Sequence, residues 1–178
     1  DNSMDYTIET WFKADEAQQT ATIISNGRGD GEDMGGSLNL FALNLEEGRL
    51  VFHNNGVRVA CDGSYADNDW HHVAVAVNRT SGRGQIYVDG KLNTYFEAAD
   101  LGGIAAAYIH LGARVWTPAD NLQQEKADNF FKGEIDEVRV WNLYKSETLV
   151  ENGNSNCLDG TEKGLLAYYP FETYIEWQ

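Results

Sequence analysis

Apolar and polar side chains alternate with a period of two along much of this chain, a pattern that a β-strand produces and a helix does not. Tyr6, Ile8 and Phe12 fall on one face of the first such segment. In residues 70–79, valines at every second position fall on one face and small alanines on the other. Further strands are predicted at 22–26, 37–45, 49–54, 57–62, 84–88, 91–96, 108–113 and 165–171.

Short turn signals join these segments. Asn55-Gly56 and Asp89-Gly90 each separate two strand-like runs, as expected for two-residue hairpin turns. Only 146–152 reads as a short helical turn, with Leu149 and Val150 facing inward. Consecutive hairpins between many short strands predict an all-β fold, an antiparallel sandwich of two sheets arranged as a jelly roll. The 178 residues fit one domain, 1–178, and we expect it to be excised from a longer secreted or surface protein.

Charge and composition exclude several partners. Acidic residues outnumber basic ones 28 to 13, for a net charge of −15, so the surface would repel nucleic acids and anionic membranes. No apolar run approaches the roughly 20 residues of a membrane span, and membrane insertion is not expected. Cys61 and Cys157 fit no zinc or redox spacing, which leaves a long-range disulfide and two unpaired thiols both open.

The alternation breaks inside the run 133–142. Ile135 falls on one face of a regular strand, whereas Val138 and Val140 fall on the other. An extra residue near Asp136 and Glu137 would restore a common apolar face. The sequence therefore predicts a β-bulge there, which would redirect the side chains beside it.

Several segments in order resemble laminin-G-like domains of the concanavalin A-like jelly-roll class. They are residues 6–13, 48–52, 69–77, 85–91, 111–114 and 131–142. The segment 164–172 is similar to the one that usually opens such domains; we expect it to complete this sandwich, the alternative being the start of a further module. The resemblance implies an extracellular or cell-surface protein that binds a glycan or another extracellular protein.

The same class also contains glucanases, whose corresponding strand carries Glu-x-Asp-x-Glu. Here these positions hold Glu134, Asp136 and Val138, so the third carboxylate is missing. A retaining glycosidase needs two carboxyl groups about 5–5.5 Å apart, and Glu137 would face the other side of a regular strand. We therefore expect a non-catalytic recognition module, with a glycoside hydrolase and a structural spacer as the alternatives.

Two sets of candidate site residues emerge. Trp116 lies in a predicted long loop, 114–129, with Arg114, Asp120 and Asn121, and could form a sugar platform; packing of the Trp116 ring against the sandwich is the preferred alternative. The resemblance also implies a structural Ca²⁺. Its expected ligands are Asp136 together with Asp1, Asn2 and Asp5, and the alternative is an Asp136 satisfied by backbone donors, Arg139 or Arg114.

Overall fold

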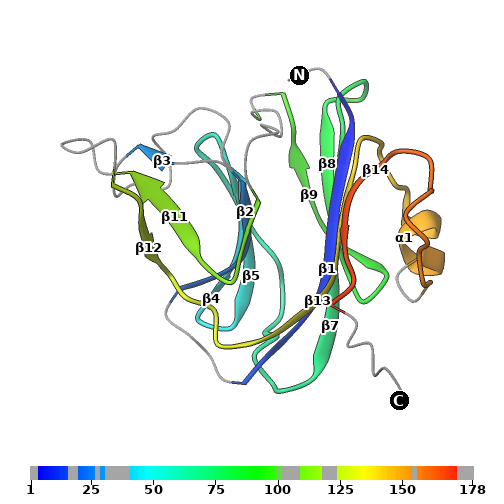
Figure 1. The fold of residues 1–178 in the computed structure, drawn as a ribbon. Coiled ribbons are helices and arrows are strands. Elements are labelled where there is room, and N and C mark those ends of the chain that lie inside the picture. Colours follow the sequence, from blue (N-terminus) through cyan, green and yellow to red (C-terminus); the bar gives the residue numbers. More distant parts are fainter. Residues whose placement is uncertain are drawn as a thin grey trace, which may run out of the picture.

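Two antiparallel sheets face each other in this computed structural model, which describes residues 4–15, 20–26, 29–30, 41–99, 101, 109–117, 124–153 and 156–171 (Figure 1). The six-stranded sheet has the order β14-β13-β1-β7-β8-β9 and the five-stranded sheet the order β10-β2-β4-β5-β6. The strands of the first are β1 Tyr6–Ala14, β7 Trp70–Asn78, β8 Arg83–Val88, β9 Lys91–Glu97, β13 Gly133–Trp141 and β14 Leu165–Tyr169. Those of the second are β2 Ala21–Asn26, β4 Phe41–Glu46, β5 Arg49–Asn54, β6 Val57–Ala60 and β10 Ile109–Leu111. The predicted jelly-roll sandwich is confirmed.

A third, three-stranded sheet was not predicted. Its strands β3 (Gly29–Asp30), β11 (Arg114–Thr117) and β12 (Lys126–Asp128) have the order β12-β11-β3, and the β11–β3 pair is parallel. Figure 1 shows β11 and β12 beside β2, away from the six-stranded sheet. The expected continuous loop 114–129 is therefore wrong, because both of its ends are strands.

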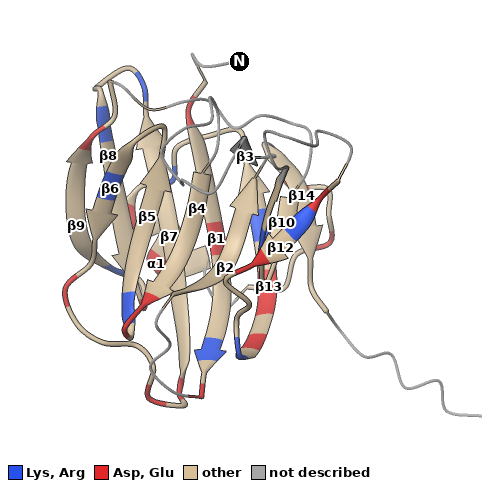
Figure 2. Ribbon diagram, turned by 90° about the vertical axis from the view of Figure 1, so that its left-hand side faces the viewer, with Lys and Arg blue, Asp and Glu red and all other residues tan. Residues whose placement is uncertain are grey.

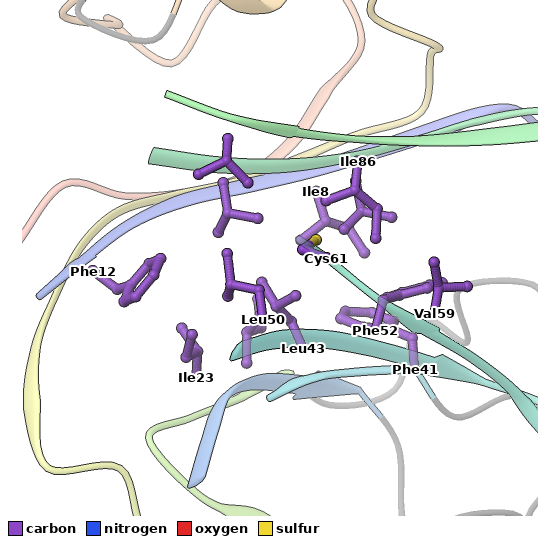
Figure 3. Close-up of a cluster of buried hydrophobic side chains, with 14 of the residues drawn as sticks. Ile8, Phe12, Ile23, Phe41, Leu43, Leu50, Phe52, Val59, Cys61 and Ile86 are labelled. Carbon is purple, nitrogen blue, oxygen red and sulfur yellow. The ribbon is translucent and has the colours of Figure 1, made fainter. Parts of the chain in front are cut away.

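The core lies between the two large sheets. Ile8, Phe12 and Ile86 from the six-stranded sheet meet Leu43 and Phe52 from the five-stranded sheet, all with at most 3% of their surface exposed (Figure 3). Each such side chain contributes about 1.5–3 kcal/mol when it leaves water. The alternation read from the sequence thus has a direct cause, since every second residue of strands such as β1 and β7 enters this core.

Both predicted hairpin turns are present. Asn55 and Gly56 have φ values of 47° and 82°, and Asp89 and Gly90 have 52° and 78°. Two successive residues with positive φ form the type I′ turn, which Asn-Gly and Asp-Gly adopt most readily. These turns set the β5–β6 and β8–β9 pairings.

The C-terminal part of the described chain covers the outer face of the six-stranded sheet, meaning the face turned away from the five-stranded sheet. Helix α1 (Glu147–Gly153) lies there in Figure 1, and its Val150 is fully buried against Ala74, Ala76 and Tyr87. Leu149, expected to face inward, is 53% exposed, because successive residues of a helix point about 100° apart and only Val150 of these two neighbours is directed to the sheet.

The segment expected to complete the sandwich does so. Strand β14 pairs antiparallel with β13 and forms one edge of the six-stranded sheet. Among the described residues, no helix is long and apolar enough to cross a membrane.

Candidate functional site

The bulge predicted in β13 is confirmed, and it determines which side chains reach the outer face. Glu9 pairs with Arg139 and Trp11 with Asp136, so β13 carries one residue more than β1 between these pairs. The extra residue is Glu137, whose φ of 51° lies in the left-handed region. The Thr10 hydroxyl donates to the Asp136 carbonyl oxygen at 2.9 Å and closes the bulge.

A glycine is required where β13 begins. Gly133 has a φ of +152°, and a Cβ added there would lie 2.0 Å from the carbonyl oxygen of Lys13. No L side chain can occupy that space without moving one of the two strands. This close contact fixes the start of the β1–β13 pairing and places Glu134 opposite Lys13.

Two tryptophans, a lysine and two carboxylates gather on the outer face where β13, β1 and β7 run side by side. One row of the sheet holds Glu134, Lys13 and Trp70, and the next holds Asp136, Trp11 and His72. We call Trp11, Lys13, Trp70, Glu134 and Asp136 the tryptophan surface. The acidic bands of β13 are visible in Figure 2.

The tryptophan surface is open to solvent. Trp70 is 41% exposed, and the side chain of Glu134 is 61% exposed. The Lys13 ammonium lies 3.3 Å from a Glu134 oxygen, while Asp136 Oδ1 accepts a hydrogen bond from the Glu137 amide at 2.8 Å. An exposed indole beside carboxylates and an ammonium offers an apolar face with polar groups at its rim.

A buried charged cluster supports this surface from the adjoining rows. Glu9 is 1% exposed, and its Oε1 accepts hydrogen bonds from Lys145 Nζ and Trp141 Nε1, both at 2.7 Å. His72 Nε2 lies 3.5 Å from the other Glu9 oxygen, and the His72 ring lies 5.4 Å from the Trp11 ring. Burial alone would raise the pKa of Glu9, but the partners His72 and Lys145 lower it to about 2.

Glu137 belongs to the same face but is engaged by other residues. The bulge turns it outward, so the expectation that it faces the opposite side is wrong for this strand. Its Oε2 accepts from Arg139 Nε at 3.1 Å, and the Tyr168 hydroxyl lies 2.9 and 3.0 Å from its two oxygens. Arg139 in turn donates to the carbonyls of Gly153 and Asn156. Glu137 therefore orients Arg139, which in turn holds Gly153 and Asn156 on the outer face, and does not face a ligand.

Trp116 lies in the three-stranded sheet and is only 8% exposed. Its Nε1 donates to Asp128 at 3.0 Å, and Lys126 and Arg114 lie 5.1 and 5.9 Å from its ring. Arg114 Nε also donates to Asp128 at 2.7 Å, and these contacts hold the pKa of Asp128 below its usual range. Such a ring has little surface left for a sugar. Asp120 and Asn121 lie outside the described residues.

The expected calcium ligands are not brought together. Asp136 pairs with Trp11, whereas Asp5 precedes β1 and accepts a hydrogen bond from the Arg79 amide at 2.7 Å. Six residues of extended strand separate Trp11 from Asp5, about 20 Å. One ion cannot bind both, so the shared site of Asp136 and Asp5 is wrong. Asp1 and Asn2 lie outside the described residues, and the described part of the chain contains no cluster of three His, Cys, Asp or Glu suited to a metal.

The family follows from comparison of the sequence with known proteins. A profile described as the concanavalin A-like lectin/glucanases superfamily matches residues 1–150. The chain belongs to this superfamily. A mouse (Mus musculus) relative, "Sushi, von Willebrand factor type A, EGF and pentraxin domain-containing protein 1", is 25% identical over 169 residues. The match covers 92% of this chain but only 4% of that protein.

Solved structures share the fold. A Bacteroides ovatus protein for which carbohydrate binding is inferred aligns with a TM-score of 0.73 at 19% identity, covering 94% of this chain and 45% of that one. The Ruminococcus gnavus IT-sialidase CBM40 bound to α2,3-sialyllactose aligns with a TM-score of 0.65 at 14% identity. That alignment covers 84% of this chain and 82% of the other. At these sequence identities, the similarity shows that the fold is shared and nothing more.

The sequence interpretation missed Trp11 and Trp70 as site residues. Period-two alternation places Trp11 opposite the core-facing Phe12, and that signal was available. What it does not give is the pairing of strands, which alone brings Trp70, Lys13 and Glu134 into one row.

Proposed function

We propose that this chain is a non-catalytic saccharide-recognition module of an extracellular or cell-surface protein, with the tryptophan surface as its binding site. The observation that carries the proposal is the 41% exposed Trp70 in one row with Lys13 and Glu134. A pyranose ring has an apolar face that stacks on an indole and hydroxyls that exchange hydrogen bonds with charged groups.

Other features support a saccharide over other ligands. The net charge of −15 disfavours nucleic acids and acidic membranes. Glu134 and Asp136 offer acceptors for sugar hydroxyls, and Lys13 offers donors. Relatives of the same fold include modules whose names state carbohydrate binding, which agrees with this assignment.

Absence of catalysis is part of the proposal. Glu137 is the third carboxylate of β13 on this face, and Arg139 and Tyr168 hold its oxygens. Val138, which stands where a glucanase strand has its third carboxylate, is fully buried in the core. Beside Glu134 the surface holds Asp136, whose Oδ1 accepts a hydrogen bond from the Glu137 amide, and β13 offers no further free carboxyl group as the acid/base partner that retaining hydrolysis requires.

A glycan array followed by calorimetry tests the binding proposal. Trp70→Ala should weaken the best array ligand by at least about tenfold, or about 1.4 kcal/mol. Tyr169→Ala is the matched control, because Tyr169 is similarly exposed at 42% but lies on the edge strand β14. Equal affinity in wild type and Trp70→Ala would refute this site, and no binding to any glycan would favour the spacer alternative.

A reducing-sugar assay with laminarin and lichenan tests the absence of catalysis. We expect no turnover. Turnover that disappears in Glu134→Gln would replace the recognition module by a glycoside hydrolase.

A further inference from the structure

An open pocket lies along the edge strand β9 of the same sheet, at the opposite end from the tryptophan surface. It has a volume of about 450 Å³ and is lined by Arg83, Tyr95, Phe96 and Glu97. That volume lies within the roughly 300–1,000 Å³ that small-ligand sites occupy. The pocket is separate from the tryptophan surface, because Trp70 begins β7 and the pocket lies beside its end at Asn78. Eight residues of strand correspond to about 26 Å.

Three of the four residues that line this pocket, Arg83, Tyr95 and Glu97, have their side chains on the outer face. Arg83 pairs with Glu97, and Gln85 pairs with Tyr95, so these four residues occupy two adjacent rows. Phe96 points the other way, into the core, where its ring lies 5.5 Å from Phe52. The pocket therefore combines an aromatic ring with one cation and one carboxylate on a firmly packed strand.

These groups are available to a ligand. Tyr95 is 62% exposed, although it is a large aromatic side chain. Within the described residues, the side chains of Arg83 and Glu97 make no hydrogen bond or ion pair with protein groups, even though they lie opposite each other in the pairing. By contrast, Gln85 accepts a hydrogen bond from Tyr144, which belongs to the segment covering the middle of the sheet.

We propose that this pocket is a second subsite for a neutral saccharide, an inference that rests on the proposed function and extends it. The Tyr95 ring receives the apolar face of a pyranose. Arg83 donates to the ring hydroxyls and Glu97 accepts from them. The two charges cancel, so the pocket favours a neutral sugar over an acidic one, which the overall negative charge would repel.

Helix α1 makes the two sites independent for short ligands. Val150 of α1 packs on Ala74 and Ala76, in the rows between the tryptophan surface and the pocket. A trisaccharide therefore occupies each site separately, whereas a polymer or a densely glycosylated surface can engage both and gain avidity.

Nuclear magnetic resonance with laminaritriose, cellotriose and maltotriose tests the proposal. At least one trisaccharide should shift the amide signals of residues 83–85 and 95–97 and, separately, the Trp70 indole signal. Tyr95→Ala should abolish the first set and leave the indole shift, and Arg83→Gln and Glu97→Gln should weaken the first set at least fivefold. Lys91→Gln, on an exposed position of the same strand, is the control and should change neither.

The outcomes separate the two proposals. If the indole responds but residues 83–85 and 95–97 do not, the second subsite is overturned and the proposed function stands. If only residues 83–85 and 95–97 respond, the pocket binds and the tryptophan surface is overturned. If neither set responds to any trisaccharide, both assignments fail.

Discussion

The Glu9 carboxylate and the Lys145 ammonium meet at 2.7 Å although 136 positions separate them in the chain. Both are buried, with 1% and 8% of their surface exposed. Glu9 belongs to β1, whereas Lys145 lies between β13 and α1. Their contact holds the residues between β13 and α1 on the outer face of the six-stranded sheet, next to the tryptophan surface.

Glu9→Gln should destabilise the protein strongly. It leaves the buried Lys145 ammonium without its counter-charge, and breaking one partner of a buried pair typically costs about 3–5 kcal/mol. Urea denaturation of both proteins measures the difference. The double variant Glu9→Leu with Lys145→Met is the control and should be less destabilised than Glu9→Gln, because no buried charge remains unpaired. A loss below about 0.5 kcal/mol in Glu9→Gln would contradict the buried pair.

The contribution of Glu9 should depend on pH in a defined window. Its pKa is about 2 in the folded protein and about 4.3 in an unfolded chain. A depressed pKa stabilises the folded state above the unfolded value, and this stabilisation is lost as pH falls from about 4.3 towards 2. The stability difference between wild type and Glu9→Gln should therefore be constant above pH 5 and shrink below pH 4.

His71 should stabilise the protein more at low pH than at high pH. Its Nδ1 lies 2.9 Å from Asp89 and its Nε2 3.1 Å from Asp67, with the Tyr65 and Phe12 rings on its flanks. Partial burial opposes the charge, but the two carboxylates outweigh it and raise the pKa of His71. Only the imidazolium has a proton for both contacts.

A raised pKa gives full stabilisation below the unfolded value of about 6.5, and the stabilisation is lost as pH rises through the folded value. His71→Gln should therefore lower the melting temperature more at pH 5.5 than at pH 8.5. The difference should be a few degrees at most, since partly exposed ion pairs contribute about 1 kcal/mol or less. An equal decrease in melting temperature at both pH values would argue against a charged His71 between Asp67 and Asp89.

The two cysteines should react as separate thiols. Both are free, Cys61 buried in the core and Cys157 exposed. Burial, reinforced by Asp62, raises the pKa of Cys61 to about 12 although Arg49 opposes the shift. Native protein should therefore expose one fast-reacting thiol to a disulfide reagent, and denatured protein two. Reductant should leave the melting curve unchanged; no titratable thiol after denaturation would instead indicate a disulfide.

Asp5→Asn and Asp136→Asn should have additive effects on stability. Each carboxylate accepts a backbone hydrogen bond at a different place, so each substitution should cost about 1–2 kcal/mol. Sites this far apart add within about 0.5 kcal/mol, whereas a shared Ca²⁺ would couple them. Calcium binding as such stays a prediction. Calorimetry with Ca²⁺, and melting curves with and without EDTA, measure calcium binding in wild type, Asp5→Asn and Asp136→Asn.

Local patterns predicted the features that depend on one strand or one turn. The break in alternation between Ile135 and Val138 indicated the bulge in β13, and Asn55-Gly56 indicated the hairpin between β5 and β6. Features that depend on pairing between distant strands were not predictable in this way. Trp11 and Trp70 become neighbours of Glu134 only through the order β13-β1-β7.

The strand at Trp116 was also not predictable from local pattern. Its surroundings in the sequence are polar and contain a proline, which is typical of a loop. The cross-strand partners Lys126 and Asp128 lie ten or more positions away, and their contacts convert this stretch into a small sheet. The predicted shared calcium site of Asp5 and Asp136 was wrong for a related reason. In the antiparallel β1–β13 pair, the start of β1 lies opposite the end of β13, so Asp5 and Asp136 lie at different ends of the pair.

The extra residue in β13 gives the chain an unusual tolerance for one change in length. If evolution or an editing experiment removed the codon for Glu137, Val138 would follow Asp136 directly, and regular alternation would keep Val138 and Val140 in the core and Arg139 on the outer face. The deletion would remove the bulge together with the contacts of the Glu137 carboxylate to Arg139 and Tyr168. Related chains could therefore lose this one residue and keep the same faces, but not two, because the second loss would exchange the faces of every following residue.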